Sequence, residues 1–429
     1  MPRGCQIFLI CLLAFAVLVG AVCIVWPIVH PSAQTSSAAA ETTSAKATTT
    51  AAAAETSAET TAAAETTAAE TTAETQTSAA AAKAQSMLES MSADEKLWQL
   101  FIATPESVTG VGTVVQAGDA TKAALAEKPV GGLIYFSKNL RDRDQAIEMI
   151  KNSQSYVKIP LLVGVDEEGG TVSRVASNSA MGTTSFDSMA TYGAAGDAAK
   201  VYDIGKTIGS ELTALGFNLD FAPVADVVTN PKNTEIGSRS FSSDPAVAAK
   251  MVGSIVSGFK DAGILCTLKH FPGHGGTDTD SHNGLSVTTR TLDEMRQSEL
   301  LPFQAGIDAG APMVMVGHLS AEQLNDGAGT PSDLSKTVVT SLLRGELGFD
   351  GVVVTDAQNM GAITDYYKPG EAAAKALEAG CDLVLMPADL QAAFDGVKAA
   401  LESGELTQER VDESVLRVLT MKYDYGILS

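Results

Sequence analysis

The stretch Val352-Val353-Val354-Thr355-Asp356 places a carboxylate directly after a short run of β-branched residues. The stretch Leu161-Leu162-Val163-Gly164-Val165-Asp166 repeats this arrangement. Continuous apolar runs of this length are typical of parallel strands that are buried on both faces. Further runs of the same kind occupy residues 132–136, 219–222, 264–268, 313–316 and 383–386. The sequence therefore predicts a set of buried strands, several of which end at a polar side chain.

Helical patterns lie between these runs. The clearest begins at Asp244-Pro245, an N-cap residue followed by proline at the first helical position, and ends before Gly263. Its predicted apolar face holds Val247, Met251, Ile255 and Phe259. Alternating strands and helices over this length indicate either an open doubly wound sheet or a (β/α)8 barrel.

Polar residues at the strand ends favour the barrel. Asp226, Lys269-His270, His318 and Asp356 each follow a predicted strand. In a (β/α)8 barrel all strand C-termini point to one mouth, so these side chains would meet in a single site. No glycine-rich nucleotide-binding motif is present to support the doubly wound alternative. We therefore predict an α/β fold with a single (β/α)8 TIM-type barrel, preceded by an N-terminal transmembrane or signal helix and a disordered linker.

The N-terminal part of the chain has a different composition. Residues 1–31 contain an uncharged apolar run from 7 to 29, which is long enough to cross a bilayer, and Arg3 precedes it. This pattern predicts a signal-anchor, with a cleaved signal peptide as the alternative. Residues 32–85 are rich in Ala, Thr, Ser and Glu and predict a disordered linker. The catalytic domain is predicted over 86–429, with its first helix capped by Ser92 and Glu95.

Composition and charge exclude several classes of protein. The 429 residues carry a formal net charge of −22, with 51 Asp and Glu against 29 Lys and Arg. Phosphate backbones require a basic face, so we expect no nucleic-acid partner. The five Cys are scattered, without the spacing of a disulfide framework or a zinc site. Cys266 and Cys381 lie in apolar runs and are predicted to be buried thiols.

The densest group of candidate functional residues spans 269–282. It contains three of the five histidines of the chain, His270, His274 and His282. His270 and His274 have the i, i+4 spacing of a zinc pair, but Phe271-Pro272-Gly273 between them cannot continue a helix, so we expect no metal site. His318 has two open interpretations, since it could line the site or bind a backbone group.

This segment resembles a known family. Lys269-His270-Phe271-Pro272-Gly273-His274-Gly275, followed by Asp280-Ser281-His282, is similar to the signature of family 3 glycoside hydrolases of the β-N-acetylglucosaminidase (NagZ-type) branch. Four further motifs of this family occur at residues 166–174, 221–226, 237–241 and 353–356. The resemblance implies a retaining exo-acting β-N-acetylhexosaminidase that removes terminal N-acetylglucosamine without a metal or organic cofactor.

The resemblance also implies roles for individual residues. Asp356 would be the nucleophile, and His282, oriented by Asp280, the acid/base. The residues that would hold the sugar are Asp166, Arg174, Arg239, Lys269 and His270. An imidazole is suited to the acid/base role because its pKa near 6.5 lets it donate and then accept a proton near neutral pH.

Two departures from the family pattern concern the surroundings of the site. The usual Asp-Gln-Glu-Gly-Gly-Arg-Val becomes Asp166-Glu167-Glu168-Gly169-Gly170-Thr171-Val172, and Ala357 replaces a common second Asp after Asp356. Because of these changes, the resemblance does not determine which leaving group the substrate carries.

The partners expected on this interpretation are N-acetylglucosaminides, in particular peptidoglycan fragments, and the membrane through the N-terminal helix. The protein is expected to be monomeric and extracytoplasmic, anchored to the cell membrane or secreted by a bacterium. Three alternatives remain: a β-N-acetylglucosaminide phosphorylase, a family 3 β-glucosidase or β-xylosidase, and a non-catalytic carbohydrate-binding surface protein.

Overall fold

The computed structural model describes residues 79–277, 284–324, 326–327 and 329–429. The predicted anchor at 1–31 and the predicted linker as far as residue 78 lie outside the described residues. So do Asp280 and His282, the predicted acid/base pair. Residues 79–90 are helical, so residues 79–85, which the sequence placed in the linker, belong to this helix.

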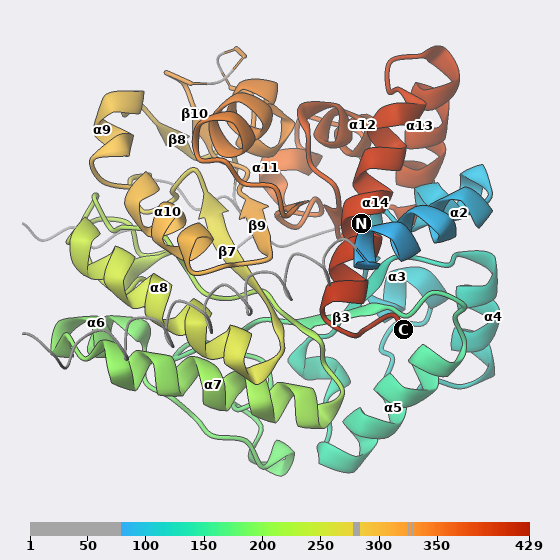
Figure 1. Ribbon diagram of the computed structural model, residues 1–429, viewed down its shortest axis with the longest axis horizontal. Coiled ribbons are helices and arrows are strands. Elements are labelled where there is room, and N and C mark those ends of the chain that lie inside the picture. Colours follow the sequence, from blue (N-terminus) through green and yellow to red (C-terminus); the bar gives the residue numbers. More distant parts are fainter. Residues whose placement is uncertain (1–78, 278–283, 325, 328) are drawn as a thin grey trace, which may run out of the picture. The chain divides into compact units, whose positions relative to one another are not determined.

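Eight parallel strands form a nearly closed barrel in the described part of the chain (Figure 1). They are β1 (Phe101–Ala103), β2 (Gly132–Ile134), β3 (Leu162–Val165), β6 (Leu219–Asp220), β7 (Leu265–Phe271), β9 (Met313–Val316), β11 (Val352–Thr355) and β12 (Val384–Leu385). The hydrogen-bonded order is β11-β9-β7-β6-β3-β2-β1-β12. A bridge between Val354 and Leu383 joins the two ends of this order. The predicted α/β barrel is thereby confirmed.

The strands have apolar side chains on both faces, which explains their uninterrupted apolar sequences. One cluster fills the barrel and includes Leu162, Phe221 and Val354. A second cluster lies between the strands and the surrounding helices and includes Val163 and Val353. Because side chains alternate along a strand, neighbouring residues such as Val353 and Val354 belong to different clusters.

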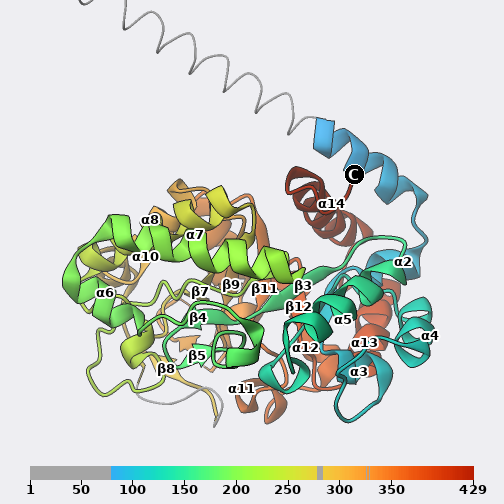
Figure 2. The same ribbon diagram turned by 90° about the horizontal axis from the view of Figure 1, so that it is seen from below.

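Helices follow every strand and surround the barrel (Figures 1 and 2). They are α3 (Pro105–Thr109), α4 (Asp119–Glu127), α5 (Arg143–Ser155), α6 (Met189–Ala195), α7 (Ala198–Leu215), α8 (Pro245–Ala262), α9 (Leu292–Arg296), α10 (Leu300–Asp308), the π-helix η6 (Thr337–Glu346), α11 (Gly361–Thr364), α12 (Pro369–Ala379), α13 (Leu390–Ser403) and α14 (Gln408–Asp424). The predicted helix after Asp244 is α8: Asp244 caps it, and Gly263 ends it in a left-handed conformation.

Helix α2 (Ala93–Trp98) directly precedes the first strand of the barrel. Ser92 and Glu95 form the predicted capping box, with reciprocal hydrogen bonds between side chain and backbone. Trp98 stacks on Phe394 of α13 with ring centroids 4.0 Å apart. Strand β1 begins three residues after Trp98 and was missing from the predicted strands. It shares one apolar stretch with α2, so the sequence gives no sign of where helix changes to strand.

Short insertions extend the end of the barrel at which the strands terminate. The hairpin of β4 (Glu167–Gly169) and β5 (Val172–Ser173) follows β3, and β8 (Val287–Thr288) pairs with β10 (Ser320–Ala321) beyond β7 and β9. Figure 2 shows β4, β5 and β8 on one side of the barrel. These insertions therefore add walls around the predicted site.

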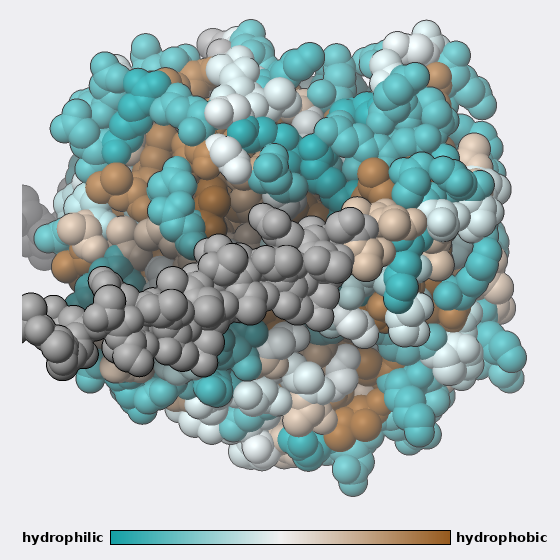
Figure 3. Space-filling model, in the orientation of Figure 1, coloured by the Kyte–Doolittle hydropathy of each residue, from teal (hydrophilic) through white to brown (hydrophobic). Residues whose placement is uncertain are grey.

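The surface in Figure 3 is mainly hydrophilic, with apolar residues in separate areas. The large apolar side chains that are exposed among the described residues are Val111, Val287, Leu301 and Tyr366. No helix in the described ranges combines the length and the apolar character needed to cross a membrane. Cys266 and Cys381 are buried free thiols, as predicted.

Candidate active site

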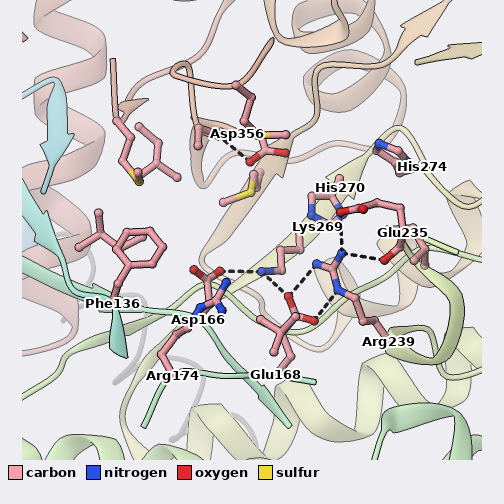
Figure 4. Close-up of a pocket in the computed structure, with 18 of the residues that line it drawn as sticks. Phe136, Asp166, Glu168, Arg174, Glu235, Arg239, Lys269, His270, His274 and Asp356 are labelled. Carbon is pink, nitrogen blue, oxygen red and sulfur yellow. Dashed lines mark hydrogen bonds and ion pairs between the residues drawn. The ribbon is translucent and has the colours of Figure 1, made fainter. Parts of the chain in front are cut away.

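A cavity of about 240 Å³ opens where the barrel strands end. Six of the eight predicted site residues line it: Asp166, Arg174, Arg239, Lys269, His270 and Asp356. Figure 4 shows Asp356 on one side of this cavity and Asp166, Glu168, Lys269 and Arg239 on the other. The barrel thus brings together residues that lie up to 190 positions apart in the sequence.

Glu168 is the centre of a charged network in this cavity. Its two carboxylate oxygens each accept a hydrogen bond of 2.8 Å from Arg239, from Nε and Nη2. The Nζ of Lys269 lies 2.7 Å from Glu168 Oε1 and 2.8 Å from Asp166 Oδ1. Glu168 and Lys269 are both nearly inaccessible to solvent. The network therefore holds its two cations and two carboxylates in fixed positions.

The charges in this network stabilise one another. Burial alone would raise the pKa of Glu168, but Lys269 and Arg239 lower it to about 2. Burial opposes the charge on Lys269 in the same way, and Asp166 and Glu168 raise its pKa nonetheless. Glu168, Lys269 and Arg239 are consequently ionised at neutral pH. The cavity wall therefore presents fixed charges that are suited to binding sugar hydroxyls.

His270 is oriented by a carboxylate beneath it. Asp226 is fully buried and lies 2.8 Å from His270 Nδ1 through its Oδ2. The same carboxylate accepts hydrogen bonds from the backbone N–H of His270 and, at 2.6 Å, from that of His274. Burial opposes the charge on Asp226, but its pKa is still lowered, chiefly by His270. Asp226 thus connects the segment after β6 to His270 near the end of β7 and to His274 beyond it.

Asp356 follows β11 directly. Its backbone N–H donates to the carbonyl of Val316 on β9 at 2.9 Å, and its Oδ1 accepts from the backbone N–H of Ala357 at 2.7 Å. Burial would raise the pKa of Asp356, but His270 and His318 are the main influences that lower it to about 2. The carboxylate is therefore ionised at neutral pH and held by the ends of two neighbouring strands.

Arg174 and Arg239 have different surroundings. Arg239 is paired with Glu168, as described above. The guanidinium of Arg174 lies over the ring of Phe136 at 5.7 Å from its centroid, and its Nε has no hydrogen-bond partner in the described part of the chain. Of the two arginines, Arg174 therefore has more hydrogen-bonding capacity to offer a ligand.

The residues that follow β7, from His274 to Thr277, are tightly packed. His274 is buried, and its Nδ1 lies 3.0 Å from the hydroxyl of Thr277. A side chain on Gly275 would approach the carbonyl oxygen of Val227 to 2.0 Å, so this position requires glycine. His274 therefore contributes to the packing of this segment. No cluster of metal-ligating side chains occurs among the described residues.

Three kinds of site residue were not assigned from the sequence. Glu168 and Asp226 lie within the family motifs at 166–174 and 221–226, but the resemblance gives them no individual role. Glu167, which replaces the usual Gln, accepts backbone hydrogen bonds from Val175 and Ala176 and so holds the turn after the β4–β5 hairpin. The apolar part of the cavity wall was also unassigned: Ile134, Phe136, Val172, Ile236, Met315, Met360, Leu385 and Met386. A cavity with both apolar and charged lining suits a sugar, which has both kinds of face.

A parallel barrel with charged side chains and an apolar wall at the strand C-termini has the arrangement of a barrel enzyme. The model of the glycosyl hydrolase family 3 N-terminal domain matches residues 92–421. The chain therefore belongs to glycosyl hydrolase family 3, as the sequence motifs indicated.

Individual proteins of this family are similar over most of the chain. β-Hexosaminidase LpqI of Mycobacterium tuberculosis is 39% identical over 341 residues, which cover 77% of this chain and 83% of LpqI. β-Hexosaminidase A of Pseudoalteromonas piscicida is 37% identical, over 70% of this chain and 54% of its own, so this chain spans about half of that relative. The structure of a family 3 β-N-acetylglucosaminidase from Paenibacillus sp. str. FPU-7 has a TM-score of 0.73 and 39% identity, with coverage of 79% and 63%.

Proposed function

We propose that this protein is a retaining exo-acting β-N-acetylhexosaminidase that removes terminal N-acetylglucosamine. The observation that carries the proposal is the ionised Asp356 carboxylate on one side of the cavity, facing the network of Asp166, Glu168, Lys269 and Arg239 on the other. The names of the similar proteins support the same activity.

In the first step, an oxygen of Asp356 attacks the anomeric carbon and forms a glycosyl ester while the glycosidic bond breaks. His282 gives its proton to the departing oxygen, as the resemblance implies, with Asp280 orienting the imidazole. In the second step His282 removes a proton from water, the water attacks the anomeric carbon, and Asp356 leaves. One water is consumed, and the sugar keeps its β configuration.

The charged network would bind the hydroxyl groups of the sugar. Lys269 and Arg239 are fixed by Asp166 and Glu168, so they need no rearrangement when the sugar ring flattens toward its oxocarbenium-like transition state. His270, fixed by Asp226, would act in the same way. The contacts that tighten in the transition state are the ones that raise the rate.

We extend the proposal to the substrate and the location. An apolar segment at residues 7–29, followed by a long linker, would place the barrel outside the cytoplasm of a bacterium, where peptidoglycan fragments carry terminal N-acetylglucosamine. Labelled muropeptides incubated with the full-length chain should release N-acetylglucosamine. Muropeptides that keep all of it would contradict this part of the proposal.

The first experiment uses aryl N-acetyl-β-glucosaminide with the full-length chain, with and without millimolar phosphate. We expect N-acetylglucosamine in plain buffer, with the β anomer formed first in an NMR time course. A sugar 1-phosphate that forms in proportion to phosphate would instead indicate a phosphorylase. The matching aryl glucoside and aryl xyloside are assayed in parallel, and faster turnover of either would indicate a family 3 β-glucosidase or β-xylosidase. If none of the three substrates is turned over, the protein is a non-catalytic carbohydrate-binding protein.

A further inference from the structure

A buried pair of a histidine and an aspartate, His318 and Asp333, lies near the proposed nucleophile but outside the cavity. His318 follows β9 and is fully buried, and it is not among the residues that line the cavity. Its Nδ1 lies 3.0 Å from Oδ1 of Asp333, which is fully buried in η5 (Ser332–Leu334). Its Nε2 lies 2.9 Å from the carbonyl oxygen of Ala357. His318 therefore binds a backbone group, one of its two predicted roles, and that group is next to Asp356.

The two neighbours of this imidazole favour its protonated form. A carbonyl oxygen can only accept, so Nε2 must carry a hydrogen. The Oδ1 of Asp333 lies 3.0 Å from Nδ1, and an ionised carboxylate there accepts a hydrogen from it. An imidazole that donates from both nitrogens is positively charged. Burial opposes this charge, but Asp333 and Asp356 raise the pKa of His318 to about 9.

The contact of His318 with Ala357 leads directly to the nucleophile. The carbonyl of Ala357 accepts from His318, and the backbone N–H of the same residue donates to Asp356 Oδ1 at 2.7 Å. The two bonds fix residue 357 from both sides, and the Asp356 backbone is fixed in turn by Val316. His318 thus contacts the backbone next to Asp356 from outside the cavity.

We propose that His318, held by Asp333, is a positioning residue for Asp356: it fixes the backbone that donates to the nucleophilic carboxylate and supplies a positive charge behind it. The proposal rests on the proposed function for the identity of the nucleophile. Its functional consequence is that Asp356 stays ionised and in a single orientation.

Other titratable groups surround this pair. They are His270 and Lys269 on β7, which also lower the pKa of Asp356, Cys381, whose thiol donates to the carbonyl of Asp333, and Tyr367 near Asp333. His270 and Lys269 act from the cavity side, where a substrate replaces solvent. His318 acts from the opposite side, where no substrate reaches, so its influence persists throughout the reaction.

The test uses His318→Gln, whose amide can still donate to the Ala357 carbonyl but carries no charge, and Asp333→Asn, which keeps the side-chain volume. The substrate is dinitrophenyl N-acetyl-β-glucosaminide, whose leaving group needs no proton. We expect kcat to fall at least about 10-fold with little change in KM, and the acidic limb of the profile of kcat/KM against pH to move to higher pH. Asp382→Asn is the matched control.

Asp382 is also fully buried and paired with Arg344 and Arg410, but it precedes β12 and lies at the opposite end of the strands. Asp382→Asn should lower the stability of the fold and leave the acidic limb of the profile of kcat/KM against pH unchanged. If the His318 and Asp333 variants fold and likewise leave that limb and kcat unmoved, the proposal is wrong.

A measurement without substrate separates this proposal from the proposed function. In protein labelled with ¹⁵N-histidine, both nitrogens of His318 should be protonated at pH 7.5, and its titration midpoint should fall in Asp356→Asn. A neutral His318 at pH 7.5 would overturn the proposal even if the enzyme is active. If the wild-type chain turned over no glycoside, the proposed function would be wrong. The ¹⁵N titration would still decide whether His318 is protonated beside Asp333.

Discussion

The carboxylate of Glu168 binds the guanidinium of Arg239 through two hydrogen bonds of 2.8 Å each, and it lies 2.7 Å from Lys269. A planar carboxylate facing a planar guanidinium is a geometry that lysine or glutamine cannot reproduce. Arg239 therefore reaches the cavity as part of a rigid pair and cannot turn toward a ligand by itself. We therefore expect this pair to influence the position of a bound sugar.

Glu168→Gln should weaken both substrate binding and folding. The change removes the carboxylate that Arg239 and Lys269 share, which leaves Lys269 with Asp166 and Arg239 with the more distant Glu235. Breaking a buried ion pair on one side costs about 3 kcal/mol, and we expect kcat/KM to fall by about 100-fold. Glu235→Gln is the control, since its carboxylate lies 3.6 Å from Arg239 and is more exposed. An unchanged kcat/KM in Glu168→Gln would contradict the role of the network.

The same residue makes a pH-dependent contribution to stability. The folded-state pKa of Glu168 is about 2, below the ordinary value of 4.5. The stabilisation from its charge is therefore complete above about pH 4.5 and is lost as the pH falls toward 2. Urea unfolding of the wild type and Glu168→Gln should show a stability difference that shrinks with acidification below pH 4.5. A constant difference between pH 5 and pH 3 would contradict the ion pair.

Asp356→Asn should leave a folded barrel with almost no activity. The amide preserves the shape of the side chain but cannot form the glycosyl ester, so we expect turnover to fall by about 1000-fold or more. Circular dichroism and the melting temperature will show that the fold is retained. Near-normal turnover in this variant would mean that another carboxylate is the nucleophile.

His282→Ala should separate acid catalysis from nucleophilic attack. Loss of the proton donor slows the departure of a poor leaving group, whereas a dinitrophenolate leaves without a proton. We expect kcat/KM to fall far more for a disaccharide of N-acetylglucosamine than for the dinitrophenyl glycoside. Equal losses on both substrates would contradict the acid/base role of His282.

The sequence was informative about strands and about the residues at their ends. Seven of the eight barrel strands and the cap of α8 could be predicted because each has a local signature. Strand β1 could not, because its three residues continue the apolar stretch of α2. The partner of Arg239 could not be predicted either: Glu168 lies 71 positions away, and a single sequence does not show which charges meet across a barrel.

Lys422→Met should change the pH dependence of stability. Lys422 of α14 is fully buried, and its Nζ donates to Gln99 Oε1 at 3.1 Å and to the Gly131 carbonyl at 3.0 Å. It forms no ion pair within the described ranges, and burial lowers its pKa to about 7. The unfolded chain, with an ordinary lysine pKa of 10.5, therefore binds more protons between pH 7 and 10.5. Lys422 thus makes the folded state more stable as the pH rises, by at most about 1.4 kcal/mol per pH unit.

Comparing the wild type with Lys422→Met isolates the contribution of Lys422 to the pH dependence of stability. His318, whose pKa is raised, makes the folded state less stable as the pH rises, but it does so equally in both proteins. We expect the free energy of unfolding in urea to rise more steeply between pH 7 and 9 in the wild type than in Lys422→Met. Lys398→Met is the control, because Lys398 lies on the surface in an exposed pair with Asp94 and should leave the slope unchanged. Parallel curves for wild type and Lys422→Met would show that Lys422 stays charged in the folded protein, with its two oxygen acceptors sufficient to hold an ammonium group in the core.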